Sequence, residues 1–446
     1  MCGGFSYMAG FRKMARDTAL LTAASLFMRC IGLIWQVWLA GRIGAAGIGL
    51  WQLVLSVSAL SATLAISGIR FTTTRLVSEE IGVGSPGSAG KAVRRCLAYA
   101  LAFGWAACLL LRLGAESIGF LWIGDARTVL SLRIIAFSLP LLSVSSVLNG
   151  WFIASGRAWV SAAVQVFEQI LEIGFVMLLL SRVDGNDLEL CCAAISRGSL
   201  LADIASFLLV AALYLLDAGH RRGGKTSKKL TIRMLRIAVP LAFSAYARTS
   251  LTTLEHLLVP RKLRAAGFSA DSALAGYGSI TGMVFPIIGF PSCLLSAAAE
   301  LTVPELTAAQ VQGDTKHIEQ TVSLLLRSAL VFSLAVAAFL FCTADALGGL
   351  IYHSESVGGY IRIFALLVPV MYMDIVTDGC LKGLGQMMQS MSYNIAEAFL
   401  GVLLVIFLLP RFALRGYIFV IFFCEIFNFT MSITRLRKVV KFRLAK

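Results

Sequence analysis

Charged residues are scarce in this chain of 446 residues: Asp, Glu, Lys and Arg make up 14% of the sequence, against roughly 25% in soluble proteins. Hydrophobic residues make up 58%, which is more apolar surface than a soluble fold could bury. Windows of about 20 apolar residues, the length that crosses a hydrocarbon core, recur along the whole chain. The sequence therefore predicts an all-α polytopic membrane protein.

Patterns for metal binding and for disulfides are missing as well. The ten cysteines are scattered, without a CxxC pair or a cluster of Cys and His. We expect no zinc site, no disulfide framework and no cofactor. The predicted outer loops are short and hold one histidine, His353, and no acidic cluster, which argues against a membrane glycosyltransferase or polymerase. We expect no catalytic residue and a protein that is not an enzyme.

The apolar windows predict about twelve membrane-spanning helices. Their approximate bounds are 18–41, 46–69, 93–113, 128–154, 158–181, 190–216, 234–258, 274–299, 320–342, 358–382, 387–409 and 414–434. Lys and Arg gather in the segments on one side of these helices, as they do on the cytoplasmic side of membrane proteins. The net charge of +15 thus indicates topology, with both termini in the cytoplasm, and does not indicate a nucleic-acid partner.

One stretch of the chain occurs twice. Residues 115–180 match residues 344–409 without a gap, at a shift of 229 positions. The coincident residues include Pro140 with Pro369, Gly150 with Gly379, Gly156 with Gly385, and Glu168 with Glu397. Equivalent spans of the two copies, such as the fourth and the tenth, are six spans apart in the chain, so both copies enter the membrane from the same side. This predicts a parallel repeat, related by an axis along the membrane normal, in two six-helix bundles around a central cavity.

The repeat and the polar segments between spans predict the domain boundaries. We expect a cytoplasmic tail at 1–16, a first bundle at 17–217, a basic cytoplasmic linker at 218–230, a second bundle at 231–436, and a basic tail at 437–446.

Two arginines inside predicted spans are the candidate substrate-binding residues. Arg29 lies about 18 Å into the first span at 1.5 Å per residue, and Arg248 answers to it in the seventh. Guanidinium groups facing a common cavity would suit phosphate or pyrophosphate. Two alternatives stay open: each arginine could pair with a carboxylate on a neighbouring helix, or could lie at the membrane edge.

Other charged and polar residues also fall within the spans. Gln165, Glu168, Gln169 and Glu172 form one stripe along a helix, which cannot face lipid. We expect Glu168 and Glu397 to form hydrogen bonds or ion pairs inside their own bundles, with proton or cation coupling as the alternative. Arg197 and Asp203 lie on different faces of the sixth span, so each needs its own partner. The remaining acids, Glu255, Asp374 and Asp378, are candidates for ion coupling.

Glycine and proline predict special backbone in the second half. Gly278-x-x-x-Gly282 and Gly379-x-x-x-Gly383 indicate close packing between helices, with a flexible hinge as the alternative. Pro286 and Pro291 should break and bend the eighth span.

Three stretches resemble the stage V sporulation protein B and polysaccharide flippase family. They are Tyr277 to Pro286 with Phe290-Pro291 and Val303-Pro-Glu305, Ile43 to Gln52 with Ser67-Gly-Ile, and Val166 to Ile170. The resemblance implies the MOP superfamily, which includes multidrug (MATE) antiporters and lipid II flippases. Arg29-Cys-Ile-Gly32 is similar to an Arg-x-x-Gly of the lipid II flippases, whereas Trp35 stands where those carry a second arginine.

The resemblance implies a function and a location. We expect a flippase in the bacterial cytoplasmic membrane that moves a polyprenyl-pyrophosphate-linked saccharide, or a lipid II-like peptidoglycan precursor, from the inner to the outer leaflet. Membrane lipid is then a further partner, and we expect a monomer. The alternative is a Na⁺- or H⁺-coupled multidrug antiporter of the MATE type.

Overall fold

The computed structural model describes residues 3–82, 86–185, 187–218 and 230–440, and within these ranges the chain is almost wholly helical, without a strand. The first half contains α1 (Gly3–Ile66), α2 (Ile69–Gly82), α3 (Pro86–Ser117), the π-helix η1 (Ile118–Ile123), the 3₁₀ turn η2 (Ala126–Thr128), α4 (Val129–Ile135), α5 (Ser138–Ala154), α6 (Ala158–Leu180) and α7 (Leu188–Ala218). The second half contains α8 (Leu230–Ala265), α9 (Ala270–Gly278), the π-helix η3 (Ser279–Val284), α10 (Phe285–Gly289), α11 (Ser292–Gln312), α12 (Thr315–Tyr352), α13 (Glu355–Ala365), α14 (Val368–Gly383) and α15 (Met387–Val439).

Eight of these helices are long and apolar enough to cross a membrane, and up to ten if each bent pair counts as one span. The bent pairs are α4 with α5, at 41°, and α13 with α14, at 55°. Two helices, α1 and α15, are each two helices joined at a non-helical residue, Gly44 and Ala413. The chain is thus a multi-pass membrane protein, and its arrangement as twelve spans in two repeats stays a prediction.

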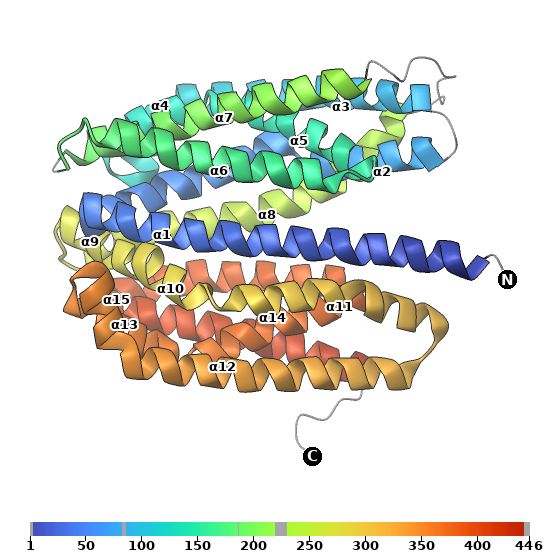
Figure 1. The fold of residues 1–446 in the computed structure, drawn as a ribbon. Helices are drawn as coiled ribbons and strands as arrows, with labels where there is room; N and C mark the ends of the chain where they lie inside the picture. Colours follow the sequence, from blue (N-terminus) through green and yellow to red (C-terminus); the bar gives the residue numbers. More distant parts are fainter. Residues whose placement is uncertain (1–2, 83–85, 186, 219–229, 441–446) are drawn as a thin grey trace. The chain divides into compact units, whose positions relative to one another are not determined.

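Two compact units divide the helices. The first unit comprises Met1–Met28 and Leu53–Thr253. Within it α5 packs against α2, α3 and α7, and α6 lies along α7 (Figure 1). The fully buried side chains of Trp151 and Phe152 on α5 belong to its apolar core, together with Leu76 of α2 and Val93 of α3.

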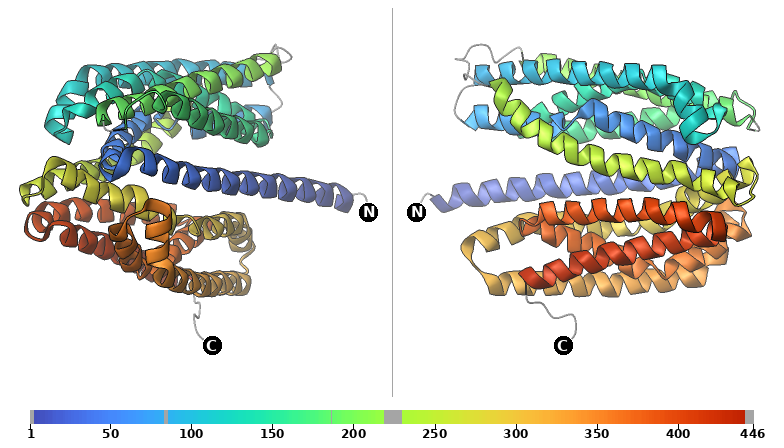
Figure 2. Two further views of the ribbon diagram at one scale, coloured as in Figure 1. Left: turned by 60° about the vertical axis from the view of Figure 1, so that its left-hand side comes forward. Right: turned by 180° about the vertical axis from the view of Figure 1, so that it is seen from behind.

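The second unit comprises Arg29–Gln52 and Leu254–Lys446. Within it α14 packs against α11, α12 and α15, and α12 lies along α13, as the three ribbon views show (Figures 1 and 2). Buried Tyr372 of α14 donates a hydrogen bond from its hydroxyl to the carbonyl of Ile288 at 2.6 Å. That carbonyl lies in the last turn of α10, where the helical ladder ends before α11 begins at Ser292.

The unit boundaries fall inside α1 and α8, whereas the sequence predicts a division at the basic linker. Of that linker, residues 219–229 lie outside the described residues, as do residues 441–446 of the predicted carboxyl-terminal tail. The predicted amino-terminal tail, 1–16, is helical from Gly3 onward. The predicted bundles at 17–217 and 231–436 stay a prediction.

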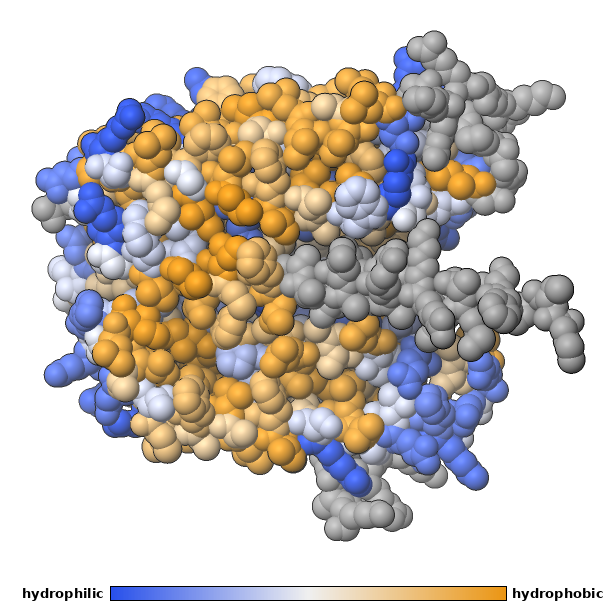
Figure 3. Space-filling model, viewed as in Figure 1, coloured by the Kyte–Doolittle hydropathy of each residue, from blue (hydrophilic) through white to orange (hydrophobic). Residues whose placement is uncertain are grey.

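The surface of each unit suits a lipid environment. Apolar side chains cover the middle of the helices in each unit, and hydrophilic ones gather at the helix ends (Figure 3). Large exposed side chains of this kind include Leu113, Phe243 and Leu350. Contiguous apolar surface on this scale is unfavourable in water and expected against hydrocarbon.

A close backbone contact inside the second unit follows the predicted repeat. A Cβ on Gly49 would lie 2.1 Å from the carbonyl oxygen of Leu274, and a Cβ on Gly278 would lie 2.3 Å from that of Ala45. A shift of 229 positions exchanges the two contacts, since it takes Ala45 to Leu274 and Gly49 to Gly278. Self-complementary contacts of this kind arise around a two-fold axis. The contact supports the repeat and confirms that Gly278 is a close-packing site.

Other predictions about glycine and proline are also confirmed. A Cβ on Gly379 would lie 2.6 Å from the Cβ of Ala299, and one on Gly383 would lie 3.1 Å from that of Leu306. The predicted eighth span is helical without a gap through α9, η3 and α10, with Pro286 in the first turn of α10, and it breaks at Phe290 and Pro291, before α11. The break at Pro291 is confirmed, and the bend at Pro286 stays a prediction.

Candidate functional sites

The first candidate site is a recess beside Arg29 in the second unit, with a volume of about 250 Å³. One face of α1 contributes four residues to it at helical spacing, and α10 with the following Phe290 contributes the opposite wall. The lining residues are Arg29, Gly32, Leu33, Gln36, Pro286, Gly289 and Phe290. The recess therefore combines one cation with apolar walls.

Gln36 is held in this recess by a consequence of Pro286. Proline has no N–H, so the carbonyl four residues earlier, that of Gly282, lacks its helical donor. The side chain of Gln36 supplies the missing hydrogen bond, from Nε2 to the Gly282 oxygen at 3.0 Å. The break in the span thus fixes the α1 side of the recess.

Arg29 itself is exposed, and it makes no ion pair with any residue that the structure describes. The guanidinium presents five N–H donors, which are suited to phosphate oxygens. Arg248 is likewise exposed, on the part of α8 that belongs to the first unit, and makes no ion pair within the described ranges. The two arginines belong to different units, so their predicted position across one cavity stays a prediction.

In the first unit, the polar stripe of α6 faces α7. Ser206 donates to Glu168 Oε2 and Ser199 donates to Glu172 Oε1, each at 2.6 Å. Asp203 of α7 lies close enough to both glutamates for electrostatic interaction, and it lies near Ser138. None of these three carboxylates is exposed, whereas Arg197 of α7 is exposed. The stripe is turned away from lipid.

One residue of this cluster escaped the sequence analysis. Arg70, half-buried on α2, lies near Glu168 and donates from Nη2 to Ser161 Oγ at 3.4 Å. It follows the predicted second span, where a basic residue is ordinarily a topology signal. The signal in the sequence was the nearby glycine, Gly68. It adopts φ +70° in the structure, where the chain turns and α2 begins as a separate helix.

In the second unit, the candidate acids fall into two groups. Asp374 and Asp378 lie one turn apart on α14; Asp378 pairs with Lys382 at 2.6 Å and accepts a hydrogen bond from Ser390. Glu255 of α8 lies against Gly401 of α15, where an added Cβ would approach Glu255 Oε2 at 2.8 Å. The predicted coupling acid Glu255 thus has different neighbours from Asp378.

Two amides and a further acid join Asp374. Asn428 of α15 donates from Nδ2 to Asp374 Oδ2 at 3.1 Å and to Asn394 Oδ1 at 3.4 Å. Glu425, which the sequence analysis passed over, lies near Asp374 and Glu397. Glu397 is half-buried, inside the second unit.

Two oxygens of this cluster lack a hydrogen bond. Asp374 Oδ1 and Asn428 Oδ1 are buried and accept no hydrogen bond of good geometry from any described residue, although Ser432 lies near the Asp374 carboxylate; Asn428 is only 5% exposed. An unsatisfied buried polar atom costs about 1–3 kcal/mol, so such atoms call for a partner. Within the described ranges, no group of three His, Cys, Asp or Glu is placed to hold a metal ion. One carboxylate and amide oxygens remain as ligands for a proton or a weakly held cation.

Comparison with known families decides the membership of this chain. The family model "Polysaccharide biosynthesis protein" matches residues 14–267, more than half of the sequence. The chain belongs to this family. A second model, "MatE", matches residues 264–407.

Similarity to individual proteins is consistent with this family. The chain is 22% identical over 409 residues to stage V sporulation protein B of Bacillus subtilis (strain 168). The matched region covers 90% of this chain and 79% of that protein. It is 21% identical over 367 residues to the lipid II flippase MurJ of the same organism, at 77% and 67% coverage. A solved inward-facing multidrug resistance MATE transporter of the MOP superfamily has the same fold, with a TM-score of 0.69, 16% identity, and 93% and 94% coverage.

These matches confirm the resemblance found in the motifs. The chain is a membrane protein of the MOP superfamily, its fold is like that of MATE transporters, and a lipid II flippase is among its relatives.

Proposed function

We propose that this protein moves a polyprenyl-pyrophosphate-linked saccharide, or a peptidoglycan precursor of the lipid II type, from the inner to the outer leaflet by alternating access. The saccharide and pyrophosphate pass through the protein, and the prenyl chain stays in lipid. The protein acts as a monomer in the bacterial cytoplasmic membrane, with both termini in the cytoplasm. The similarity to stage V sporulation protein B and to the lipid II flippase MurJ supports this substrate class.

The observation that carries the proposal is the recess at Arg29. A cation inside a membrane span is costly unless it meets water or an anion, and Arg29 has no carboxylate partner among the described residues. The alternative of pairing with an acid on a neighbouring helix is therefore not supported for Arg29, and the same holds for Arg248. Both guanidinium groups remain available for pyrophosphate.

The direction of movement has a physical driving force. An inside-negative membrane potential favours outward movement of an anion by about 2.3 kcal/mol per charge per 100 mV. A pyrophosphate-linked lipid therefore moves outward without requiring a coupling ion.

The test is a flipping assay in proteoliposomes with a labelled lipid-linked sugar. Each of Arg29→Ala and Arg248→Ala should lower the flipping rate by at least about tenfold, the value of one charge-assisted hydrogen-bond set. Arg29→Lys keeps the charge and loses the fork, so it should retain an intermediate rate. Arg75→Gln, at an exposed arginine paired with Glu79 at 3.1 Å, is the matched control and should flip at the wild-type rate. Full activity of the double alanine variant would refute the anion site.

A second candidate function is a cation-coupled antiporter of the MATE type, with Asp374, Asp378 and Glu255 as the coupling acids. The unsatisfied oxygens of Asp374 and Asn428, together with the match to the MatE family model, favour it. The two functions are separated by the cargo. Uptake of an organic cation driven by a Na⁺ or H⁺ gradient, lost in Asp374→Asn, would establish the antiporter. Flipping of the lipid-linked sugar, lost in Arg29→Ala, would establish the flippase.

A further inference from the structure

The recess beside Arg29 has one side chain that can accept a hydrogen bond. Of the seven residues that line it, five are apolar or glycine, Arg29 only donates, and Gln36 carries an amide that both donates and accepts. The volume of about 250 Å³ is below the roughly 300–1,000 Å³ of sites that enclose a drug-sized ligand. The recess therefore has room for only part of a lipid-linked saccharide.

A hydrogen bond to the backbone fixes which way the Gln36 amide faces. Its Nε2 donates to the carbonyl oxygen of Gly282 at 3.0 Å. Two carbonyl oxygens cannot pair with each other, so the amide cannot be reversed. Gln36 is half-buried, and its Oε1 makes no hydrogen bond to any residue in the described ranges. The acceptor end of the amide therefore remains for a ligand.

The polar and apolar groups of the recess follow one another along α1. Arg29, Leu33 and Gln36 lie on one face of the helix. Arg29 and Gln36 are two turns apart, about 10 Å along the helix axis. Opposite them stand the apolar side chains of Pro286 and Phe290. The order along the recess is thus a cation, an apolar strip with an aromatic ring across from it, and a hydrogen-bond acceptor.

This order matches the chemistry of a sugar attached to a pyrophosphate. The anion meets Arg29, the carbon atoms of the sugar ring meet Leu33 and Phe290, and a hydroxyl or amide group of the sugar donates to Gln36 Oε1. A prenyl chain, a bare phosphate or an organic cation would each leave part of this row unmatched.

We propose that Gln36 binds the first sugar of the lipid-linked saccharide and selects for a hydrogen-bond donor on it. This role of Gln36 rests on the proposed function. Sugars further along the saccharide lie outside the recess and do not contact Gln36.

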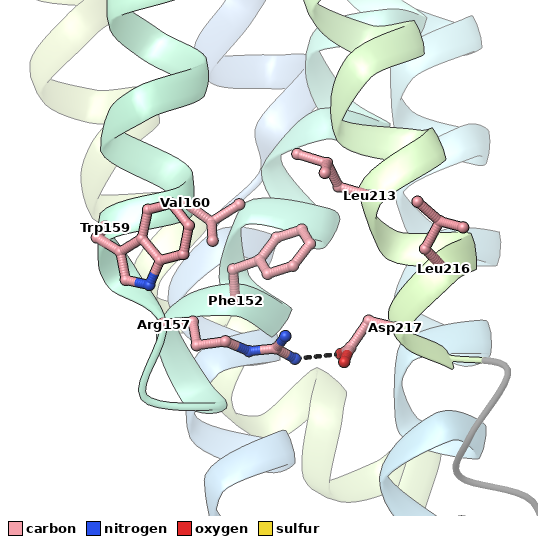
Figure 4. A pocket seen from close by; sticks show the side chains of 7 residues that line it. All are labelled: Phe152, Arg157, Trp159, Val160, Leu213, Leu216 and Asp217. Carbon is pink, nitrogen blue, oxygen red and sulfur yellow. Dashed lines mark ion pairs between the residues drawn. The ribbon is translucent and has the colours of Figure 1, made fainter.

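The larger pocket of the first unit offers no such row of groups. It has a volume of about 500 Å³ and lies at the ends of α5, α6 and α7. There the guanidinium of Arg157 faces the carboxylate of Asp217, with which it forms an ion pair (Figure 4). Asp217 also accepts a hydrogen bond from Trp151 Nε1 at 2.9 Å. The arginine of that pocket thus has an acid beside it, whereas Arg29 makes no ion pair with any described residue.

The test compares two soluble ligands of equal charge. One is geranyl-pyrophosphoryl-glucose, and the other carries a cyclohexyl group in place of glucose, so it keeps the pyrophosphate and the six-membered ring but has no hydroxyl group. Their affinities for the purified full-length protein in detergent are measured by isothermal titration calorimetry. The ratio of the two affinities should fall about fivefold in Gln36→Leu, the value of one neutral hydrogen bond. Arg29→Ala should weaken both ligands and leave their ratio unchanged.

Two further variants separate contact with the sugar from a structural role of Gln36. Gln52 of the same helix also lies near Gly282 but does not line the recess, so Gln52→Leu should leave the ratio unchanged. Gln36→Lys can donate to the Gly282 carbonyl but accepts no hydrogen bond, so it should lower the ratio even if Gln36→Leu fails to fold. Loss of a merely structural contact would instead weaken both ligands alike.

A substitution at Gly289 tests the location of the ligand. An added Cβ at Gly289 meets nothing within 4 Å, so the side chain of Gly289→Leu would occupy the recess and should weaken both ligands. Gly359 is equally open and lies outside the recess, so Gly359→Leu should bind both ligands as the wild type does.

The binding measurements do not depend on flipping. Binding with this dependence on Gln36, without movement of a lipid-linked sugar in proteoliposomes, would refute the proposed function and leave the role of Gln36 standing. An equal ratio in the wild type, Gln36→Leu and Gln36→Lys would overturn that role, whatever the flipping rates are. Absence of measurable binding of both ligands to the wild type would overturn it as well.

Discussion

The two copies of the repeat, residues 115–180 and 344–409, can be compared position by position. Their backbone features coincide: Gly156 and Gly385 are both left-handed, and the bends before α5 and α14 lie in the same register. The ion pairs Glu116–Arg133 and Asp345–Arg362 are equivalent at a shift of 229 positions, and each joins residues 17 apart.

The interior polar side chains of the copies differ. Ser145 and Asn149 of the first copy are replaced by Asp374 and Asp378 in the second, and Glu172 is replaced by Gly401. The residues around the conserved glutamate also differ between the copies. Glu168 of the first unit lies near Arg70, whose counterpart 229 positions later is Ala299.

The comparison shows which structural constraints the two stretches share. Turns, bends and close helix contacts are set by backbone sterics, which both copies need in the same places. A buried polar side chain needs only some partner, so it can change when its partner changes too. The first unit satisfies Glu168 and Glu172 with hydroxyl groups and an arginine. Both units contain buried oxygens without a hydrogen bond among the described residues, among them the amide oxygens of Gln169 and Asn149 in the first unit, but only in the second is one of them a carboxylate oxygen, that of Asp374. This carboxylate oxygen makes the second unit our proposed place for ion coupling.

The largest effect is expected where equivalent residues of the repeat meet. Gly278→Leu would force a side chain against the backbone of Ala45 and Gly49, which cannot yield as a flexible side chain does. Such overpacking should cost about 3 kcal/mol or more and remove most folded protein. Size-exclusion profiles and thermal unfolding in detergent would measure this.

A matched control and a twin are available in the same unit. Gly359→Ala meets nothing within 4 Å, so it should fold as the wild type does. Gly49→Leu should be as damaging as Gly278→Leu, because its contact is the equivalent one. An unchanged melting temperature for Gly278→Leu would contradict the close contact.

The next largest effect is expected on stabilisation by Na⁺, which we expect to depend on an acid of the second unit and not on one of the first. If the second unit holds a coupling cation, Na⁺ at a hundred times its dissociation constant should stabilise the wild type by about 2.7 kcal/mol. Asp374→Asn should abolish that stabilisation. Glu168→Gln should keep it, since the amide oxygen of Gln still accepts from Ser206 and the site lies in the other unit. Thermal unfolding in Na⁺ and in choline distinguishes the two variants; a loss of the response in Glu168→Gln alone would reverse the assignment of roles.

Some features of the fold and of the candidate sites could be predicted from the sequence, and others could not. The close-packing glycines and the helix break at Pro291 could be predicted, because they follow from backbone sterics that single residues report. The stripe of Glu168 and Glu172 was visible from spacing alone. The hydrogen-bond partners of the buried acids could not be predicted. Asn428 lies 54 positions after Asp374, and the contact between them depends on how α15 is rotated against α14. Periodicity specifies the buried face of one helix but does not specify which residues of two helices meet.

A smaller effect, equal in both copies, is expected at the left-handed glycines. Gly156→Ala and Gly385→Ala each place a Cβ in open space, so only the backbone conformation is strained. The cost should be about 1 kcal/mol at each position. Matched denaturation curves of the two variants test this equality. A shift in one copy several times that in the other would show that the turns are not equivalent.

The smallest effect is expected at the two equivalent ion pairs. Arg133 and Glu116 have side chains 45% and 64% exposed, and Arg362 and Asp345 are 46% and 71% exposed, so solvent and headgroups screen both pairs. Arg133→Gln and Arg362→Gln should each change stability by less than about 1 kcal/mol, and the double variant by the sum, since the sites share no partner. Melting temperatures of the single and double variants would show this. A loss well above the sum would mean that the two pairs act together, and the copies would then be coupled through more than their shared backbone frame.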